Sequence, residues 1–392
     1  MNVILIAGGP WQAFLLRYLK TRGYCVHVVN PVRSDTTAAA DGFIQEDVRD
    51  IEKIQPLIEK LHPLFVTSDQ SDTAIFSVAL LSQKLGLPGN PPDAIRRFVD
   101  KGCMYDYAAS IGLPLPPYAI GTGLEDVRAF AGKVGLPIIV KPVDATGTRG
   151  FAIIDDIDAA EPALRTSLAY TRSGRFITQK YVRANVEITL EGFCSGSEHR
   201  TLTGSSKTHF SPGIASSLLY PFSREEMLDQ IISWNDTFVN NSGMKFGLTH
   251  AEYMIDTKSG TFWLTEIAAR GAGCAISSEI VPWVSGVDVY DLLCRSLTGD
   301  SIDLNSLCVR NDRCAMAQFY DRTTMAGITK GKIEMIRAVD GVHDFFLDFR
   351  RHDYLPSEPG NRNSRHSLAI VRTKTLQELE EALRNIKSIL SR

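Results

Sequence analysis

The sequence predicts a mixed α/β protein that begins with a doubly wound parallel sheet, and three patterns support this prediction. Short apolar strands alternate with helices through the first 95 residues, which is typical of such a sheet. Two apolar strands meet at a tight turn near the middle of the chain. Near its end, a strand is followed by an amphipathic helix. We therefore expect a Rossmann-like N-terminal domain over residues 1–95, a central domain over 96–300 and a small C-terminal α+β domain over 301–392.

The composition argues against several classes of function. The 392 residues carry a formal net charge of −3, which is not the basic charge of a nucleic-acid-binding protein. No apolar run approaches the length of a membrane helix, so we expect no membrane partner. The first residues form an apolar strand that lacks the basic start of a secretory signal. The seven cysteines are scattered without a CxxC pair, which favours reduced thiols in a cytoplasmic protein.

The N-terminal elements are punctuated by clear turn signals. We expect strands at residues 3–7, 25–29 and 64–67, and helices at 12–21, 51–61 and 73–85. Gly8 and Gly9 follow the first strand, but no third glycine completes a dinucleotide fingerprint, so neither NAD nor FAD is expected. Asp69 and Asp72 follow the strand at 64–67, where ligands gather in open α/β sheets. They would either orient the amino group of a substrate or simply cap a helix.

Lysines and a glycine-rich loop then indicate an anionic ligand. Lys141 closes an apolar strand, and a buried ammonium at a strand end needs an anionic partner. Lys101 stands at the start of a predicted helix and, taken alone, is better explained as a solvated lysine. The segment 144–151 is rich in glycine and hydroxyl groups, so its backbone N–H groups can wrap a polyphosphate, although such clusters are also ordinary turns. A strand at 176–180 leads into a linker, with Glu187 shortly after it.

Two carboxylates on neighbouring strands are the most informative feature. Glu252 and Glu266 lie in the apolar runs 247–256 and 261–270, which read as a hairpin that can place both side chains on one face. Without a cation the two anions would repel, and one would be pushed to protonate. Mg²⁺ removes this conflict, because it takes carboxylate and phosphate oxygens together. With the permanent charge of Arg270 close by, the pattern predicts a site for Mg-ATP.

This ordered series resembles the ATP-grasp superfamily over roughly residues 95–300, and the run EIAARGAG at 266–273 resembles its branch of L-amino acid ligases and sugar-carboxylase-like enzymes. The resemblance implies an ATP-grasp fold with a mobile lid subdomain over about residues 113–183. Many members carry asparagine two positions after the second metal-binding acid, where this chain has Ala268. The number of tightly bound Mg²⁺ ions therefore stays open.

The resemblance implies a role for each matching position. Residues that would bind the ATP phosphates are Lys101, Lys141, Thr146, Gly147, Thr148 and Gly150. Those at the adenine and the ribose would be Gln179, Lys180, Tyr181, Val182 and Glu187. Glu252 and Glu266 would hold Mg²⁺, for which Mn²⁺ can substitute. Arg270 and Lys141 would be catalytic, and Arg270 would steady an acyl phosphate.

Two further stretches bear on the substrates. Residues 205–223 are expected to form an irregular loop, either edging the acceptor pocket or lying on the surface. Within and beyond it, the candidate substrate contacts are Lys207, His209, Arg270 and Gly273, together with Asp69 and Asp72. Near the end we expect strands at 333–337 and 367–372, a turn-rich loop at 356–365 and a helix at 376–390. Arg362, Arg365 and His366, on or beside that loop, are read as solvated surface more readily than as cleft residues.

The resemblance implies an ATP-dependent carboxylate–amine ligase that forms an acyl phosphate, releases ADP and phosphate, and has an amino acid as its expected substrate. One alternative is an enzyme that forms carboxyphosphate from bicarbonate and carboxylates or carbamoylates a small metabolite. Another is an ATP-binding module without catalysis. In each case the partners are small molecules, and a homodimer is left open.

Overall fold

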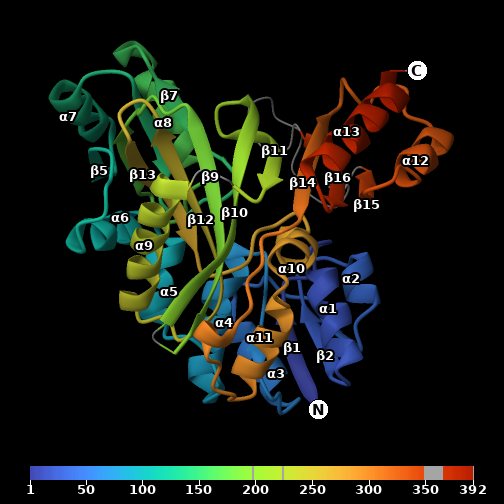
Figure 1. The fold of residues 1–392 in the computed structure, drawn as a ribbon. Coiled ribbons are helices and arrows are strands. Elements are labelled where there is room, and N and C mark those ends of the chain that lie inside the picture. Colours follow the sequence, from blue (N-terminus) through green and yellow to red (C-terminus); the bar gives the residue numbers. More distant parts are fainter. Residues whose placement is uncertain (197, 223–224, 348–364, 392) are drawn as a thin grey trace.

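The computed structural model describes residues 1–196, 198–222, 225–347 and 365–391. Within them the strands form three sheets, and the mixed α/β class is confirmed. Figure 1 shows the N-terminal sheet and its helices at the bottom and the long strands of the largest sheet rising through the centre. A small sheet with its helices and the C-terminal helices lie on opposite sides at the top. No helix in the described residues is both long and apolar enough to cross a membrane.

The N-terminal sheet is parallel, with strand order β3-β2-β1-β4. Its strands are β1 (Asn2–Ile6), β2 (Cys25–Val29), β3 (Gly42–Ile44) and β4 (Val66–Thr67), and its helices are α1 (Gln12–Thr21), α2 (Asp35–Ala38), α3 (Ile51–Glu59) and α4 (Asp72–Leu85). One face of the sheet buries apolar side chains of β1, β2 and β4 against α3 and α4. The other face buries the alternate side chains of β1 and β2 against α1. The expected strands and helices are all present, because each is bounded by glycine, proline or a polar cap that stops it.

The small sheet is antiparallel, with order β5-β8-β6-β7, and it carries the first half of the cleft described below. Its strands are β5 (Tyr118–Gly121), β6 (Ile138–Pro142), β7 (Ala152–Ile154) and β8 (Phe176–Lys180). Its helices are α7 (Leu124–Val134), η1 (Ile157–Ala159) and α8 (Ala160–Leu168), while α6 (Lys101–Ser110) contacts both this sheet and β13, and α5 (Pro92–Val99) packs on α4, α6 and β13. Helices α7 and α8 cover one face and bury its apolar residues.

The largest sheet has the order β13-β12-β9-β10-β11-β14-β16-β15, so strands from the C-terminal part of the chain extend the central sheet. Its strands are β9 (Val186–Ser195), β10 (Glu198–Ser211), β11 (Ile214–Tyr220), β12 (Phe246–Asp256), β13 (Thr261–Ala268), β14 (Cys314–Asp321), β15 (Val342–Leu347) and β16 (Arg365–Thr373). The link is the antiparallel pair β11–β14. The division at residue 300 stays a prediction.

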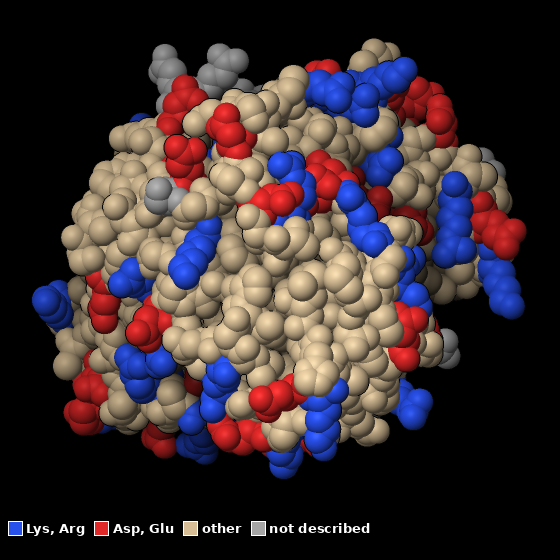
Figure 2. Space-filling model, turned by 90° about the horizontal axis from the view of Figure 1, so that it is seen from below, with Lys and Arg blue, Asp and Glu red and all other residues tan. Residues whose placement is uncertain are grey.

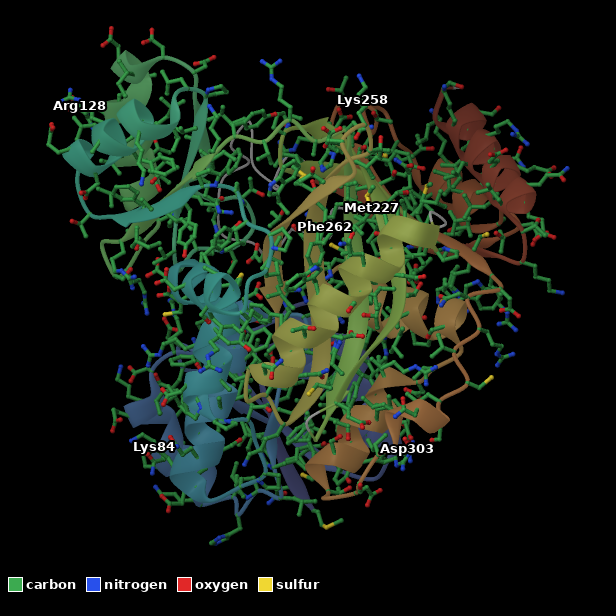
Figure 3. The ribbon with its side chains drawn as sticks, turned by 60° about the vertical axis from the view of Figure 1, so that its left-hand side comes forward. Lys84, Arg128, Met227, Lys258, Phe262 and Asp303 are labelled. Carbon is green, nitrogen blue, oxygen red and sulfur yellow. The ribbon has the colours of Figure 1, made fainter. Side chains whose placement is uncertain are left out.

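Helices pack on both ends of this sheet. They are α9 (Glu225–Asn241), η2 (Ile276–Ile280), α10 (Val281–Ser285), α11 (Val289–Leu297), η3 (Leu304–Ser306), α12 (Lys330–Arg337) and α13 (Leu376–Ser391). In Figure 3, Lys258 marks the β12–β13 turn and Arg128 marks α7, both at the top, while Lys84 on α4 and Asp303 lie at the bottom. Figure 2 shows the molecule from below, where side chains of both charge signs are interspersed around an uncharged area.

Two sequence-based expectations about local structure are wrong. Residues 205–220 form the paired strands β10 and β11 and not an irregular loop. Hydroxyl side chains there bond across strands, Ser205 with Thr189 and Thr208 with Ser217, each at 2.7 Å. The segment expected to be a strand at 333–337 is helical, because Thr329 caps α12 by accepting a hydrogen bond from the Lys332 amide. The expected loop at 356–365, including Arg362, lies outside the described residues except for Arg365.

Candidate functional site

A cleft of about 620 Å³ lies between the small sheet and the largest sheet. Its lining includes most of the residues singled out in the sequence: Asp72, Lys101, Lys141, Gly147, Thr148, Gln179, Lys180, Tyr181, Val182, Glu187, Lys207, His209, Glu252, Glu266, Arg270 and Gly273. Thr146, Gly150 and Asp69 do not line it. Residues from Asp72 to Arg365 therefore meet on one concave surface, as ligand sites usually require.

The hairpin β12–β13 places the two central carboxylates directly opposite each other. Glu252 and Glu266 are paired positions in the antiparallel register, so their side chains leave the same face of the sheet. The register shifts between Glu252 and Tyr253, which marks a bulge beside the site. The apolar alternation of both strands fixes this register, because a slip by one residue would turn the buried Tyr253 and Leu264 to the other face.

Lys207 on β10 joins two of the acids. Its Nζ lies 2.7 Å from Glu187 Oε1 and 2.6 Å from Glu252 Oε1. Burial alone would lower the pKa of Lys207, but the two carboxylates raise it above its ordinary value. Burial would likewise raise the pKa of Glu252, but the charge of Lys207 holds it well below its usual range. Glu187 and Glu252 are therefore ionised at neutral pH. Glu187 faces the cleft and is also paired with the Lys207 ammonium.

His250 is a site residue that the sequence reading missed. Its Nδ1 lies 2.9 Å from Glu191 Oε1, and its Nε2 lies 3.2 Å from Glu252 Oε1. Glu191 Oε1 also accepts a hydrogen bond of 2.9 Å from the Tyr220 hydroxyl. Burial lowers the pKa of His250, but the charge and hydrogen bond of Glu191 raise it to about 9. The signal in the sequence was the position of His250 two residues before Glu252, which puts both on one face of a strand.

Lys101 and Lys141 approach the carboxylates from the other wall. Lys101 Nζ lies 3.2 Å from Glu266 Oε1 and donates a 2.9 Å hydrogen bond to the Ala145 carbonyl. Within the described parts of the chain, Lys141 has no ion pair, and its Nζ lies 5.8 Å from the centre of the Tyr105 ring. Burial, followed by the charge of Lys101, lowers the pKa of Lys141 to about 8. An anion in the cleft would relieve both effects.

The glycine-rich loop bends over the cleft from the small sheet. Gly147, Thr148 and Gly150 all have a positive φ, of 67°, 63° and 70°. Thr148 donates a 3.2 Å hydrogen bond to the Gly213 carbonyl, so the loop touches the β10–β11 turn across the cleft. Thr146 does not face the cleft and accepts hydrogen bonds from Arg149. Gly150 packs on Pro142, whose Cγ would lie 2.8 Å from an added Cβ, so its role is to shape the loop.

The far end of the small sheet gives the cleft an apolar slot with one polar edge. Ile139, Met254 and Leu264 line it beside the segment from Gln179 to Val182. Gln179 Nε2 is buried and has no hydrogen-bond partner among the described residues. The Lys180 ammonium donates to the Gly135 and Leu136 carbonyls at 3.0 and 3.1 Å, so it braces the strand connection. An unpaired amide donor beside apolar side chains suits the flat edge of a heteroaromatic base.

Arg270 is bound by a carboxylate of the N-terminal unit. Its Nε and Nη2 donate to the two carboxylate oxygens of Asp72 at 2.7 and 2.9 Å. Asp72 does not cap helix α4, because Ser71 is the cap and accepts from the Ala74 amide. Asp69 is buried below the cleft, where it accepts hydrogen bonds from the Gly271 amide, Ser277 and Tyr290. The expected contact between Asp69 and a substrate is therefore not supported, and its carboxylate instead fixes the loop after Arg270.

The remaining candidates edge the cleft. His209 Nε2 lies 2.9 Å from Glu187 Oε2. A Cβ added at Gly273 would have nothing within 4 Å, so the cleft is open above it. Arg365, which the sequence reading treated as surface, is part of the cleft lining, and this is a correction. Arg365 reaches the cleft because β16 pairs with β14, and the sequence around Arg365 does not predict that pairing.

The donor set can be tested for a divalent metal. Among the described residues, no group of three or more His, Cys, Asp or Glu side chains could hold a metal ion by itself. Glu252 and Glu266 offer two facing carboxylates, and the position of the usual third ligand is the buried Ala268. Mg²⁺ is commonly bound by one or two carboxylates together with substrate phosphates. The residues fit a metal that binds together with a phosphate ligand, and they do not form a closed protein cage.

Part of the chain matches a known family. Residues 100–191 match the family model of the carbamoyl-phosphate synthase L chain, ATP binding domain. The large chain of carbamoyl phosphate synthase from Methanothermobacter thermautotrophicus is 26% identical over 150 residues, which are 38% of this chain and 14% of that protein. The chain therefore spans a small fraction of the length of the curated relatives that it matches.

Solved structures resemble the whole chain. L-amino acid ligase from Bacillus licheniformis has a TM-score of 0.81 at 18% identity, covering 99% of this chain and 97% of that one. N5-carboxyaminoimidazole synthetase from Staphylococcus aureus, complexed with ADP, has a TM-score of 0.77 at 17% identity, covering 98% and 96%. At these identities the likeness concerns the fold, and it confirms the ATP-grasp fold that the sequence predicted.

Proposed function

We propose that this protein, which has the ATP-grasp fold, is an ATP-dependent carboxylate–amine ligase that releases ADP and phosphate and uses an amino acid as substrate. The observation that carries the proposal is Lys141, a partly desolvated ammonium without an ion pair in the described residues, facing Glu252 and Glu266 across one cleft. A cation held in this way lacks only an anionic ligand, and a triphosphate supplies one. Small molecules are the partners, and a cytoplasmic location and a homodimer stay predictions.

The chain's own groups would neutralise and position the reactants. We assign the phosphates to Lys101, Lys141 and the backbone of 147–150, the adenine to Gln179–Val182 and the ribose to Glu187. Glu252 and Glu266 would hold Mg²⁺, which would offset phosphate charge when bound. A substrate carboxylate oxygen attacks the γ-phosphorus and ADP leaves. The amine then attacks the acyl carbon, phosphate leaves, and the amine loses a proton to water or phosphate.

Closure of the loop at 147–150 would exclude water from the acyl phosphate. The hydrogen bond from Thr148 to the Gly213 carbonyl already connects the two walls of the cleft, and it gives the loop a closed position. Glu187 is assigned to the ribose, and it also forms ion pairs with Lys207 and His209. Binding of the nucleotide is therefore expected to redistribute these ion pairs.

Arg270→Ala is expected to leave ATP binding in place and lower product formation by about 10²–10³-fold, because the charge that stabilises the oxyanion is lost. The substitution also removes the guanidinium that binds both carboxylate oxygens of Asp72, which lowers stability. The double variant Arg270→Ala with Asp72→Asn separates the two effects, since it also removes the carboxylate charge that Arg270 neutralises. We expect it to recover melting temperature and not turnover. Recovery of turnover in the double variant would show that Arg270 acts only through structure.

ATP binding is expected to take up protons near pH 8.5. In the folded protein, burial and the charge of Lys101 lower the pKa of Lys141 to about 8. At about pH 8.5 part of the Lys141 side chains are therefore neutral. The phosphates would raise that pKa again, and a proton enters with the ligand. At about pH 6.5 Lys141 is already charged, so the uptake vanishes. Calorimetry in buffers of different ionisation enthalpy measures this directly, and Lys141→Met should abolish it. Equal uptake at both pH values would contradict the assignment.

One alternative reaction has support of its own. The matched family model and the Staphylococcus aureus neighbour come from a carbamoyl-phosphate synthase and an N5-carboxyaminoimidazole synthetase. An enzyme that activates bicarbonate would use the same ATP residues. Phosphate release should be followed with bicarbonate alone, with amino acids, and with pairs of carboxylates and amines. Release that depends on two amino acids supports the ligase, whereas release with bicarbonate supports the alternative. ATP binding without phosphate release in any mixture would indicate an ATP-binding module and contradict both reactions.

A further inference from the structure

The ammonium group of Lys207 connects two parts of the proposed nucleotide site. Its Nζ lies 2.7 Å from Glu187 Oε1, in the carboxylate assigned to the ribose, and 2.6 Å from Glu252 Oε1, in a carboxylate assigned to the metal. The side chain of Lys207 is only 8% exposed, so solvent screens these two contacts weakly. One buried cation therefore pairs with a carboxylate from each of two ligand positions.

The largest sheet fixes this bridge. Lys207 on β10 is directly opposite Glu187 on β9, and Glu252 on β12 is directly opposite Thr189 on the other side of β9. Glu187 and Thr189 are two residues apart, so Lys207, Glu187 and Glu252 all leave the same face of the sheet. Diagonal neighbours of this kind lie within reach of a long side chain. The bridge across β9 is therefore a consequence of strand register.

The lining of the cleft is basic as a whole. Among the described residues, seven lysines and arginines line it, against four aspartates and glutamates. Such a surface attracts a polyphosphate and repels a divalent cation that arrives without one. The two carboxylates assigned to the metal are each paired with a lysine, Glu252 with Lys207 and Glu266 with Lys101. A metal at either acid would compete with an ammonium that belongs to the protein.

Lys207 differs in this respect from Lys141. In the described part of the chain Lys141 forms no ion pair, so it suits an incoming phosphate. Lys207 already has two short contacts with carboxylates. A divalent metal on Glu252 would share that carboxylate with the Lys207 ammonium, and two cations so close repel each other. The ammonium has to turn away from Glu252 before the metal binds there well.

We propose that Lys207 is an internal cation that competes with the divalent metal for Glu252 and makes metal binding depend on the nucleotide. The inference rests on the proposed ATP-dependent function and adds an order, in which the metal enters with the nucleotide and not before it. A ribose at Glu187 and a metal at Glu252 both require the bridge to open. The ligand that opens it removes this cost for the other, so the two bind cooperatively.

The carboxylates do not depend on Lys207 alone for a donor. His209 Nε2 lies 2.9 Å from Glu187 Oε2, and His250 Nε2 lies 3.2 Å from Glu252 Oε1. Both acids therefore keep one partner when Lys207 is replaced. We expect Lys207→Met to be destabilised and still folded, because the buried anions lose a cation and keep a hydrogen bond. Lys207→Gln, which retains a donor without the charge, serves the same test if methionine unfolds the protein.

Titration of Mn²⁺ by electron paramagnetic resonance, without any nucleotide, tests the inference apart from turnover. We expect Lys207→Met to bind Mn²⁺ at least about tenfold more tightly than the parent, because the competing cation is gone. Lys207→Arg, which restores the charge, should bind Mn²⁺ as weakly as the parent. The factor by which ADP tightens Mn²⁺ binding should be smaller in Lys207→Met. Mn²⁺ alone should raise the melting temperature of Lys207→Met more than that of the parent.

Lys258→Met is the matched control. Lys258 is exposed at the turn of the hairpin that carries both metal-assigned acids, away from the cleft lining (Figure 3). Its Mn²⁺ affinity should equal that of the parent.

The outcomes separate this inference from the proposed function. Mn²⁺ affinity in Lys207→Met no higher than in the parent, or equally raised in Lys258→Met, would overturn the role of Lys207. Equal affinity of the parent for Mn²⁺ with and without ADP would overturn the order of binding. A structural role alone would lower Mn²⁺ affinity in Lys207→Met, which is the opposite sign. Failure of the parent to bind Mn²⁺ even with ADP would instead contradict the metal site of the proposed function.

Discussion

Lys141→Ala is expected to lower kcat for phosphate release by about a hundredfold to a thousandfold, the usual effect of removing one preorganised group that stabilises transition-state charge. The side chain faces Glu252 and Glu266 from β6, and among the described residues it forms no ion pair. Its ammonium is therefore available to the phosphates. Because burial already lowers its pKa, charged Lys141 is tolerated poorly by the fold without a ligand. Alanine should leave the melting temperature unchanged or slightly raised.

The sign of this stability effect can be checked with pH. The pKa of Lys141 is lower in the folded state than in the unfolded chain, so the unfolded chain binds more protons between about pH 8 and 10. The contribution of Lys141 to the free energy of unfolding therefore falls as the pH drops from about 10 to about 8. The difference in melting temperature between Lys141→Ala and its parent should therefore grow from about pH 10 to pH 7.

The matched control is Lys133→Ala, an exposed lysine on helix α7 of the same small sheet. It removes the same charge from the same part of the chain without touching the cleft. Turnover of this variant should equal that of the parent. If Lys141→Ala retained parental turnover as well, or if both variants lost it equally, Lys141 would have no part in binding the phosphates.

Glu266→Gln is expected to abolish phosphate release and to weaken Mn²⁺ binding at least about tenfold in the presence of ADP, because the proposed metal ligand loses its charge. Titration of bound Mn²⁺ by electron paramagnetic resonance reads the metal without turnover. The substitution also frees Lys101, whose Nζ lies 3.2 Å from Glu266. Affinity for ADP without metal should therefore hold or rise slightly, since the freed ammonium can turn to the phosphates.

Glu125→Gln is the control for this variant. Glu125 forms an exposed ion pair with Arg128 on helix α7, where a lost charge has little effect on stability. It should leave Mn²⁺ affinity and turnover at the parental values. Parental Mn²⁺ affinity in Glu266→Gln would remove that acid from the metal site, and the facing Glu252 would then need testing by the same titration.

The sequence predicted the structure best where a local pattern defines an element. The period-two alternation and the tight turn define the β12–β13 hairpin, so the facing of Glu252 and Glu266 followed from them. Helix α1 and strand β2 match their expected bounds to the residue, because turn residues stop both. Lys141 was expected to face a ligand because it closes an apolar strand, and the structure places it on the cleft lining.

The features of the site that the sequence did not predict depend on pairing between strands that are distant in the chain. The bridge from Lys207 to Glu187 and Glu252 requires β10 beside β9 and β12, and a serine-rich run gave no sign that residues 205–211 form a strand. Arg365 reaches the cleft only because β16 joins β14 in the largest sheet. Short apolar runs such as 333–337 suit either a helix or a strand, and the cap at Thr329 decided in favour of the helix.

The continuity of the largest sheet from β11 to β14 has a consequence for how the protein folds during synthesis. Strand β12, which carries Glu252, and strand β16, which begins at Arg365, belong to one hydrogen-bonded sheet, and β16 is made about 170 residues after β9. A nascent chain that has emerged only as far as β13 holds every assigned ATP contact, yet β11 still presents an unpaired edge. The edge of β11 is therefore covered only late in translation, when β14 pairs with it and β16 brings Arg365 to the cleft lining.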